Sequence, residues 1–173
     1  MKKQFTLSIA LAVTLSTAFL TNAQANDSTV NIKMFFGDKG IDSDAWSAQD
    51  DHGTVGILTD FKTGYEGMRV ALDLFGSGSE EKTSSQVKGT YTAEAHLGIR
   101  KYFELQSKFE PYIGGGINLA YASQKNDNGS EETEEEDMDS GLWLNSGVDF
   151  FVNDNITIGI DLRYSNAALR AIG

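Results

Sequence analysis

The stretch EGMRVALDLF, residues 66–75, alternates between two kinds of side chain. Successive side chains of an extended strand point to opposite faces, so alternate residues share a face. One face of this stretch carries Met68, Val70, Leu72 and Leu74. The other face carries Arg69, Ala71 and Asp73. Such a strand must lie between an apolar environment and a polar one.

Similar alternation recurs in seven segments, which lie near residues 30–36, 55–61, 66–75, 91–102, 112–121, 142–150 and 156–164. Short connections are expected at 62–66, 104–108 and 153–155, and longer, acidic ones at 38–52, 76–88 and 124–140. Alternating strands with short turns on one side and long loops on the other are typical of membrane β-barrels. The pattern predicts an all-β fold, an antiparallel up-and-down transmembrane barrel of the eight-stranded type with seven strands visible.

The two faces decide between this barrel and a soluble periplasmic β-sandwich or barrel, because a membrane barrel is apolar outside and polar inside. The polar face also carries Gly56, Ala71, Gly98, Gly114, Gly116, Gly147 and Gly159, which would make room for long charged side chains in a narrow lumen. We therefore place the polar face inside. Its ionisable residues are Lys33, Asp60, Arg69, Asp73, Glu94, His96, Arg100, Asp149, Asp161 and Arg163.

The apolar face is interrupted only by Thr59, Gly115 and Ser146, none of which is charged. A charge there would cost about 2–4 kcal/mol at the centre of a bilayer, so its absence fits a lipid-facing surface. Aromatic residues at the strand ends are expected to form two belts at the membrane interfaces. The belts would consist of Phe61, Tyr65, Tyr102, Phe103, Phe109, Tyr112, Phe150 and Phe151 at one end, and Phe36, Phe75, Tyr91, Tyr121, Trp143 and Tyr164 at the other.

Residues 1–25 have the anatomy of a secretory signal, with Lys2 and Lys3, an apolar run from Phe5 to Leu20, and a small-x-small site at Ala23–Ala25. The alternative, a permanent membrane anchor, is disfavoured because the run is short and ends at this site. The barrel domain is then residues 26–173. The chain has no cysteine and a formal net charge of −11, which excludes a disulfide scaffold and argues against a nucleic-acid partner.

Bacterial barrels have an even number of strands, because an odd number would leave unpaired edges in hydrocarbon. Seven visible strands therefore predict that a C-terminal eighth strand is missing. An error in strand count or register is the competing explanation.

Three stretches carry a resemblance to known families. Residues 109–116, FEPYIGGG, and residues 147–155, GVDFFVNDN, resemble strands of the small opacity-protein and OmpA/OmpX-like outer-membrane barrels. This resemblance implies a bacterial, Gram-negative outer-membrane location, contact with membrane lipid and lipopolysaccharide, and insertion by the barrel-assembly machinery. Residues 163–169, RYSNAAL, look like the His-x-Ser-Asn-Ala segment of lipid A deacylases, but Arg163 stands where that family has its histidine and cannot act as a base for Ser165.

The interior charges predict a salt-bridged plug, since five acids face four bases and an unpaired buried ion is unfavourable. A gated ion path or proton relay is the alternative. His96 and His52 are each interpreted as ordinary residues, not metal ligands. We predict no catalytic residue, cofactor or metal site.

Residues 131–139, EETEEEDMD, hold seven carboxylates and are expected to form a mobile, solvated loop tip. The sharper alternative is weak divalent-cation bridging to lipopolysaccharide phosphates or to a surface partner. Asn126, Asn128, Gly129 and Glu135 partly match a calcium loop, but Gln124 stands at the first-ligand position, so an EF-hand is not predicted.

The sequence thus favours a non-enzymatic barrel that anchors and displays surface loops around a charge-plugged lumen. A narrow channel for small solutes is the first alternative, and a lipid A deacylase-like hydrolase is the second.

Overall fold

The computed structural model describes residues 10–17, 30–40, 51–83, 86–103, 105, 108–127, 132–153 and 156–167. They form eight strands in a closed antiparallel barrel, in which each strand pairs with its neighbours in the chain. The strands are β1 (Ala10–Thr17), β2 (Val30–Gly40), β3 (Asp51–Lys62), β4 (Met68–Thr83), β5 (Gln86–Tyr102), β6 (Phe109–Asp127), β7 (Glu132–Asn153) and β8 (Ile156–Ser165). Within these described residues, no helix has the length and apolar character needed to span a bilayer.

The seven predicted strands are β2 to β8, and the all-β up-and-down fold is confirmed. The structure differs from the prediction between β2 and β8, where an eighth strand was expected to be missing. Strand β1 pairs with β2 from Ala10↔Lys39 to Leu15↔Met34 and with β8 from Ala10↔Arg163 to Thr17↔Ile156. The sequence predicts this segment to be part of the signal, outside the barrel domain of residues 26–173. It closes the sheet because β2 and β8 would otherwise expose unpaired backbone groups to hydrocarbon.

Cleavage of a signal after Ala25 stays a prediction, because residues 1–9 and 18–25 lie outside the described residues. Removal of β1 would reopen the sheet between β2 and β8. The N-terminal residue of the protein isolated from outer membranes is therefore informative about which segment closes the barrel in the cell.

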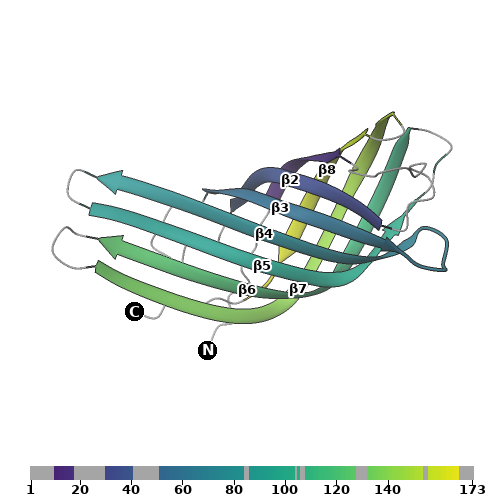
Figure 1. Cartoon of the computed structure of the whole chain (residues 1–173). Coiled ribbons are helices and arrows are strands. Elements are labelled where there is room, and N and C mark those ends of the chain that lie inside the picture. Colours follow the sequence, from purple (N-terminus) through teal and green to yellow (C-terminus); the bar gives the residue numbers. More distant parts are fainter. Residues whose placement is uncertain are drawn as a thin grey trace.

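The prediction of long loops at 76–88 and 124–140 was wrong. Pairing of β4 with β5 continues to Thr83↔Gln86, and pairing of β6 with β7 continues to Asp127↔Glu132. Figure 1 shows these four strands extending side by side beyond the end of β3. Outside the bilayer a strand needs its hydrogen-bonding neighbour but no apolar face, so hydrophobic alternation does not detect it. The loop predicted at 38–52 is shortened at both ends, and residues 41–50 lie outside the description.

A short turn between β3 and β4 agrees with the prediction for residues 62–66. The Thr63 hydroxyl donates to the Met68 carbonyl at 2.8 Å and accepts from the Tyr65 amide at 3.2 Å. Gly67 has a φ of 63°, a left-handed conformation that glycine adopts without steric cost. The turn returns the chain directly into the next membrane strand.

The polarity of the barrel is the inverse of that in a soluble protein. Leu72, Leu97 and Ile158 are 42, 50 and 39 % exposed on the outside. Asp73, Arg100 and Asp161 are completely buried on the inside. The apolar outer face therefore suits contact with lipid, as predicted.

The aromatic belts are only partly as predicted. Exposed rings at the short-turn end include Phe61, Tyr65, Phe103, Phe109, Phe150 and Phe151, and Tyr91 is exposed on β5. Tyr102, Tyr112 and Trp143 are buried instead, and Phe75 lies against the buried Phe35. Their parity explains this, because each is an even number of residues from a charged residue of the same strand that points inward.

Glycines of the inner face make room mainly for aromatic rings, whereas we had expected them to accommodate charged side chains. A Cβ atom added to Gly98 would lie 2.7 Å from Cζ2 of Trp143, and one on Gly56 would lie 2.5 Å from Cδ1 of Phe75. A Cβ atom on Gly147 would collide with the ring of Tyr112. These rings and the charged groups between them fill the lumen.

Candidate functional site: the charged lumen

The candidate site is the column of side chains that fills the barrel from the short-turn end to the opposite mouth. All ten residues predicted to face inward do so, and nine of them are buried. Arg69, the tenth, has a side chain that is 11 % exposed. The column has three levels, which we call the lower, middle and upper levels.

At the lower level, Lys33 of β2 forms an ion pair with Asp149 of β7. Its ammonium group also donates to the Tyr102 hydroxyl at 3.1 Å, and that hydroxyl donates to Asp60 at 2.5 Å. The Lys33 nitrogen lies 5.1 and 5.0 Å from the ring centres of Tyr102 and Tyr112. Cation–π contact and ion pairing together compensate for burying this ammonium group.

At the middle level, Arg100 of β5 bridges two carboxylates. Its guanidinium pairs with Asp60 of β3 and, at 2.7 Å, with Asp73 of β4. Asp161 of β8 accepts hydrogen bonds from the Tyr112 hydroxyl at 2.8 Å and from the Asn145 amide at 2.6 Å. Strands on different sides of the barrel are therefore joined through its centre.

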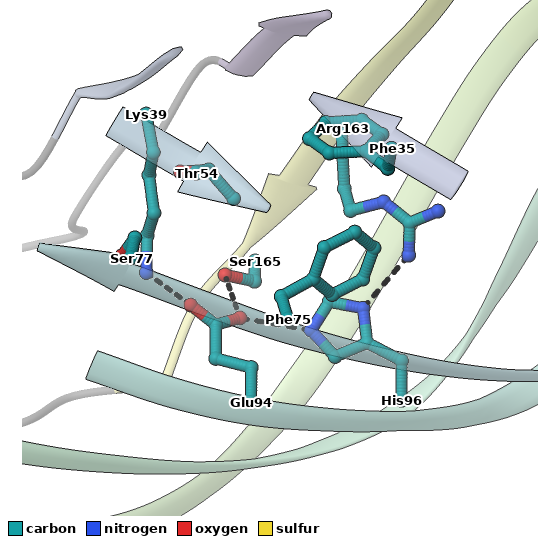
Figure 2. Close-up of a pocket in the computed structure, with 9 residues that line it drawn as sticks. All are labelled: Phe35, Lys39, Thr54, Phe75, Ser77, Glu94, His96, Arg163 and Ser165. Carbon is teal, nitrogen blue, oxygen red and sulfur yellow. Dashed lines mark hydrogen bonds and ion pairs between the residues drawn. The ribbon is translucent and has the colours of Figure 1, made fainter. Parts of the chain in front are cut away.

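At the upper level, Arg163 of β8 donates to Asp73 at 2.8 Å, to Asp161 at 3.3 Å and to Nδ1 of His96 at 2.9 Å. Nε2 of His96 lies 2.8 Å from Glu94, and Lys39 forms an ion pair with the same carboxylate. Figure 2 shows Arg163, His96, Glu94 and Lys39 joined in one chain of contacts. The column ends here, at the outer mouth.

Cations and rings alternate through the three levels. Arg69 lies 3.9 Å from the ring centre of Tyr102, and Arg100 lies 5.5 and 5.9 Å from those of Tyr112 and Trp143. Arg163 lies 5.0 and 4.5 Å from those of Trp143 and Phe75. The aromatic rings thus separate the like charges while attracting each of them.

Sequence reasoning missed two charged members of the column, Lys39 and Glu110. Lys39 was assigned to a loop, and Glu110 pairs with Arg69 at 3.6 Å next to a predicted turn. Both have the parity of residues predicted to face inward on the same strands, Lys33 and Gly114, which is the signal that could have identified them. With these two, six acidic side chains meet five basic ones among the described inner residues.

A small cavity lies at the upper level, with a volume of about 30 Å³. Its lining includes the rings of Phe35 and Phe75, the hydroxyls of Thr54, Ser77 and Ser165, and the charged groups of Lys39, Glu94, His96 and Arg163 (Figure 2). Space of this size holds one or two water molecules. It is too small for an organic solute.

Ser165 does not meet a base in the way a catalytic serine must. Its hydroxyl donates to Glu94 at 3.3 Å, and His96 contacts the other side of the same carboxylate oxygen. In a serine–histidine–acid site the histidine lies between the other two. Arg163, which replaces the histidine of the deacylase segment, faces the lumen with Ser165.

The acidic segment 131–139 is mostly strand, in contrast to the predicted loop tip, since β7 begins at Glu132. Glu134 accepts from Ser123 at 3.1 Å and lies 3.5 Å from Lys125. Among the described residues, no three His, Asp or Glu side chains gather as metal ligands would. Asn128 and Gly129 of the calcium-loop comparison, and Glu131 of the acidic segment, lie outside the described residues.

A closed antiparallel barrel with an apolar outside and an ion-paired inside defines an integral membrane β-barrel. Residues 8–169 match the family described as the outer membrane protein beta-barrel domain. The chain belongs to this family, and it is a protein of the bacterial outer membrane, as predicted. A comparison with curated proteins found no match.

The chain also has some similarity to several solved structures. Neisserial surface protein A is 15 % identical, with 92 % of this chain and 95 % of that chain covered and a TM-score of 0.43. Ail, the attachment invasion locus protein of Yersinia pestis, is 9 % identical, with 95 and 98 % covered and a TM-score of 0.46. The N-terminal β-barrel domain of Pseudomonas aeruginosa OprF is 11 % identical, with 94 and 99 % covered and a TM-score of 0.23.

Proposed function

We propose that this protein is a rigid, non-enzymatic anchor in the outer membrane, whose lumen is plugged and whose projecting strands are displayed at the cell surface. The observation that carries the proposal is the column of ion pairs and rings that crosses the barrel interior. An eight-stranded barrel has an interior only wide enough for side chains. Here those side chains contact one another at every level, which favours a plug over a solute path.

The plug predicts that the barrel does not conduct. In planar bilayers the protein is expected to give no discrete conductance steps in potassium chloride, because Trp143, Arg100 and Tyr112 block the lumen without exposure to solvent. The matched variant is Trp143→Ala, which removes the largest of these side chains and is expected to produce leakage. Conductance in the parent would instead support the narrow channel, provided that it is also seen in a variant in which Lys33 and Asp149 are neutralised together.

The displayed surface is the outward continuation of β4 to β7. In this part of the sheet, the register between β7 and β8 begins at Trp143↔Ser165, and residues 132–141 of β7 continue beyond it. Residues 132–139 of this continuation carry six carboxylates, which attract basic side chains. We propose that the continuation contacts basic, extended segments of partner proteins, in addition to the lipopolysaccharide around it.

A peptide test examines this display role. The protein in lipid nanodiscs is expected to bind an extended lysine-containing peptide, and binding is expected to weaken steeply between low salt and about 1 M salt, where the screening length falls to about 3 Å. Replacing Glu134, Glu135 and Glu136 together by glutamine should weaken binding in the same way. Glu66→Gln, at the short-turn end, is the control and should change nothing. Equal binding by all three proteins would contradict the proposal.

A further inference from the structure

His96 lies at the upper level of the lumen with both ring nitrogens in contact with charged groups. Nε2 is 2.8 Å from a carboxylate oxygen of Glu94, and Nδ1 is 2.9 Å from a guanidinium nitrogen of Arg163 (Figure 2). An arginine side chain only donates hydrogen bonds, so Nδ1 must accept and carries no proton. The single ring proton is then on Nε2 and is donated to Glu94. The contacts therefore define a neutral imidazole in one tautomer.

A second proton could bind His96 only at Nδ1, which faces Arg163. That proton would remove the acceptor used by the guanidinium and place two cations against each other. Arg163 keeps two other partners, Asp73 and Asp161, which lie on the side away from the mouth. Protonation of His96 thus removes the contact between Arg163 and His96 and leaves Arg163 with Asp73 and Asp161 only.

Other groups surround the ring on every side. Strand β4 contributes Asp73 and Phe75, β5 itself Glu94, β6 Asn118, β7 Trp143, and β8 Arg163 and Ser165. Behind them lie Lys39, Arg100 and Asp161, the partners of Glu94, Asp73 and Arg163 respectively. These carboxylates already have cationic partners, since Asp73 also pairs with Arg100 and Glu94 pairs with Lys39. A proton on His96 therefore adds a cation beside Arg163.

Protons have a route to this ring. The cavity of about 30 Å³ beside His96 has room for water and carries three hydroxyl groups, those of Thr54, Ser77 and Ser165. It lies at the outer mouth, where β2, β3, β4, β5 and β8 meet (Figure 2).

We propose that His96 is a proton-operated latch at the outer end of the plug. Neutral His96 holds Arg163 over the rings of Phe75 and Trp143, and protonated His96 releases it toward Asp161 and Asp73. The latch rests on the proposed plug but concerns its response to acid, which is a separate property.

The ring of Trp143 provides a reporter. It stacks on His96 with centres 5.5 Å apart and planes at 22°, and an imidazolium ring quenches the fluorescence of a neighbouring indole. The chain has two tryptophans, so Trp46→Phe leaves Trp143 as the sole emitter. In detergent micelles, its emission is expected to fall in one step on acidification. His96→Gln should abolish the step, because glutamine can accept from Arg163 and donate to Glu94 but does not titrate. His52→Gln should leave it unchanged.

Nitrogen NMR of the parent gives a second measurement that needs no lumen variant. At neutral pH, Nδ1 of His96 is expected to be unprotonated, and the side-chain nitrogen signals of Arg163 should shift over the same pH range as the fluorescence. A proton on Nδ1 at neutral pH, or a fluorescence step that survives His96→Gln, would overturn the latch. Conductance at neutral pH tests the plug independently, so a failed latch in a non-conducting barrel leaves the plug intact.

Discussion

Replacing Arg100 by methionine is expected to lower the free energy of unfolding by about 3–5 kcal/mol, because it removes the buried cation shared by two buried carboxylates. Arg100 is completely buried and pairs with both Asp60 and Asp73. Methionine has a similar length but no donor for either carboxylate. Urea-induced unfolding of the protein in lipid vesicles measures the change.

The control for Arg100→Met is Lys125→Met, which breaks the pair with Glu134. Both side chains of that pair are nearly half exposed, so its loss should cost about 1 kcal/mol or less. Adding Asp60→Asn to Arg100→Met should recover part of the lost stability, since one uncompensated charge is removed. If Arg100→Met were no more harmful than Lys125→Met, the lumen would be water-filled and the proposed plug would be wrong.

A charge on the outer face is expected to have the second large effect. Leu97→Arg places a guanidinium on the apolar exterior of β5 and should destabilise the barrel by about 2–4 kcal/mol in a bilayer, because the charge must leave water for hydrocarbon. The same unfolding measurement in vesicles detects it.

Met138→Arg is the matched control for Leu97→Arg. Met138 is also exposed on the outer face, but it lies on β7 opposite Tyr121, in the outward continuation of the sheet. Its replacement should change stability by less than about 1 kcal/mol, because charges near the interface are tolerated. Equal effects of the two substitutions would mean that Leu97 is not surrounded by lipid.

The upper level shows why sequence reasoning could list charged residues but not pair them. Glu94 and His96 are neighbours on one face of β5, which their spacing predicts. Arg163, which contacts His96, is 67 positions away along the chain. Which strand delivers the partner depends on barrel closure and stagger, and no local pattern encodes these.

Tyr102, Tyr112 and Trp143 show a different limit. Aromatic side chains at strand ends suit a membrane interface, and we placed them there although their parity pointed inward. Inside, each ring meets a cation, and glycines give space to two of the rings, Gly98 to Trp143 and Gly147 to Tyr112. Strand parity predicts the face of each ring better than its position at a strand end, because the pleat of a strand fixes the face to which each side chain points.

The amino-acid sequence by itself determined seven strands of the membrane zone, their inverted polarity and ten of the ionisable residues that face inward, because alternation with period two follows from the geometry of a single strand. Tertiary structure alone decided three further features: the closure of the sheet by Ala10–Thr17, the long outward continuation of β4 to β7, and the partner of each buried charge. These features depend on hydrogen bonds and ion pairs between segments that are distant in the chain. These hydrogen bonds and ion pairs form, and stabilise the protein, only when the barrel brings those segments together.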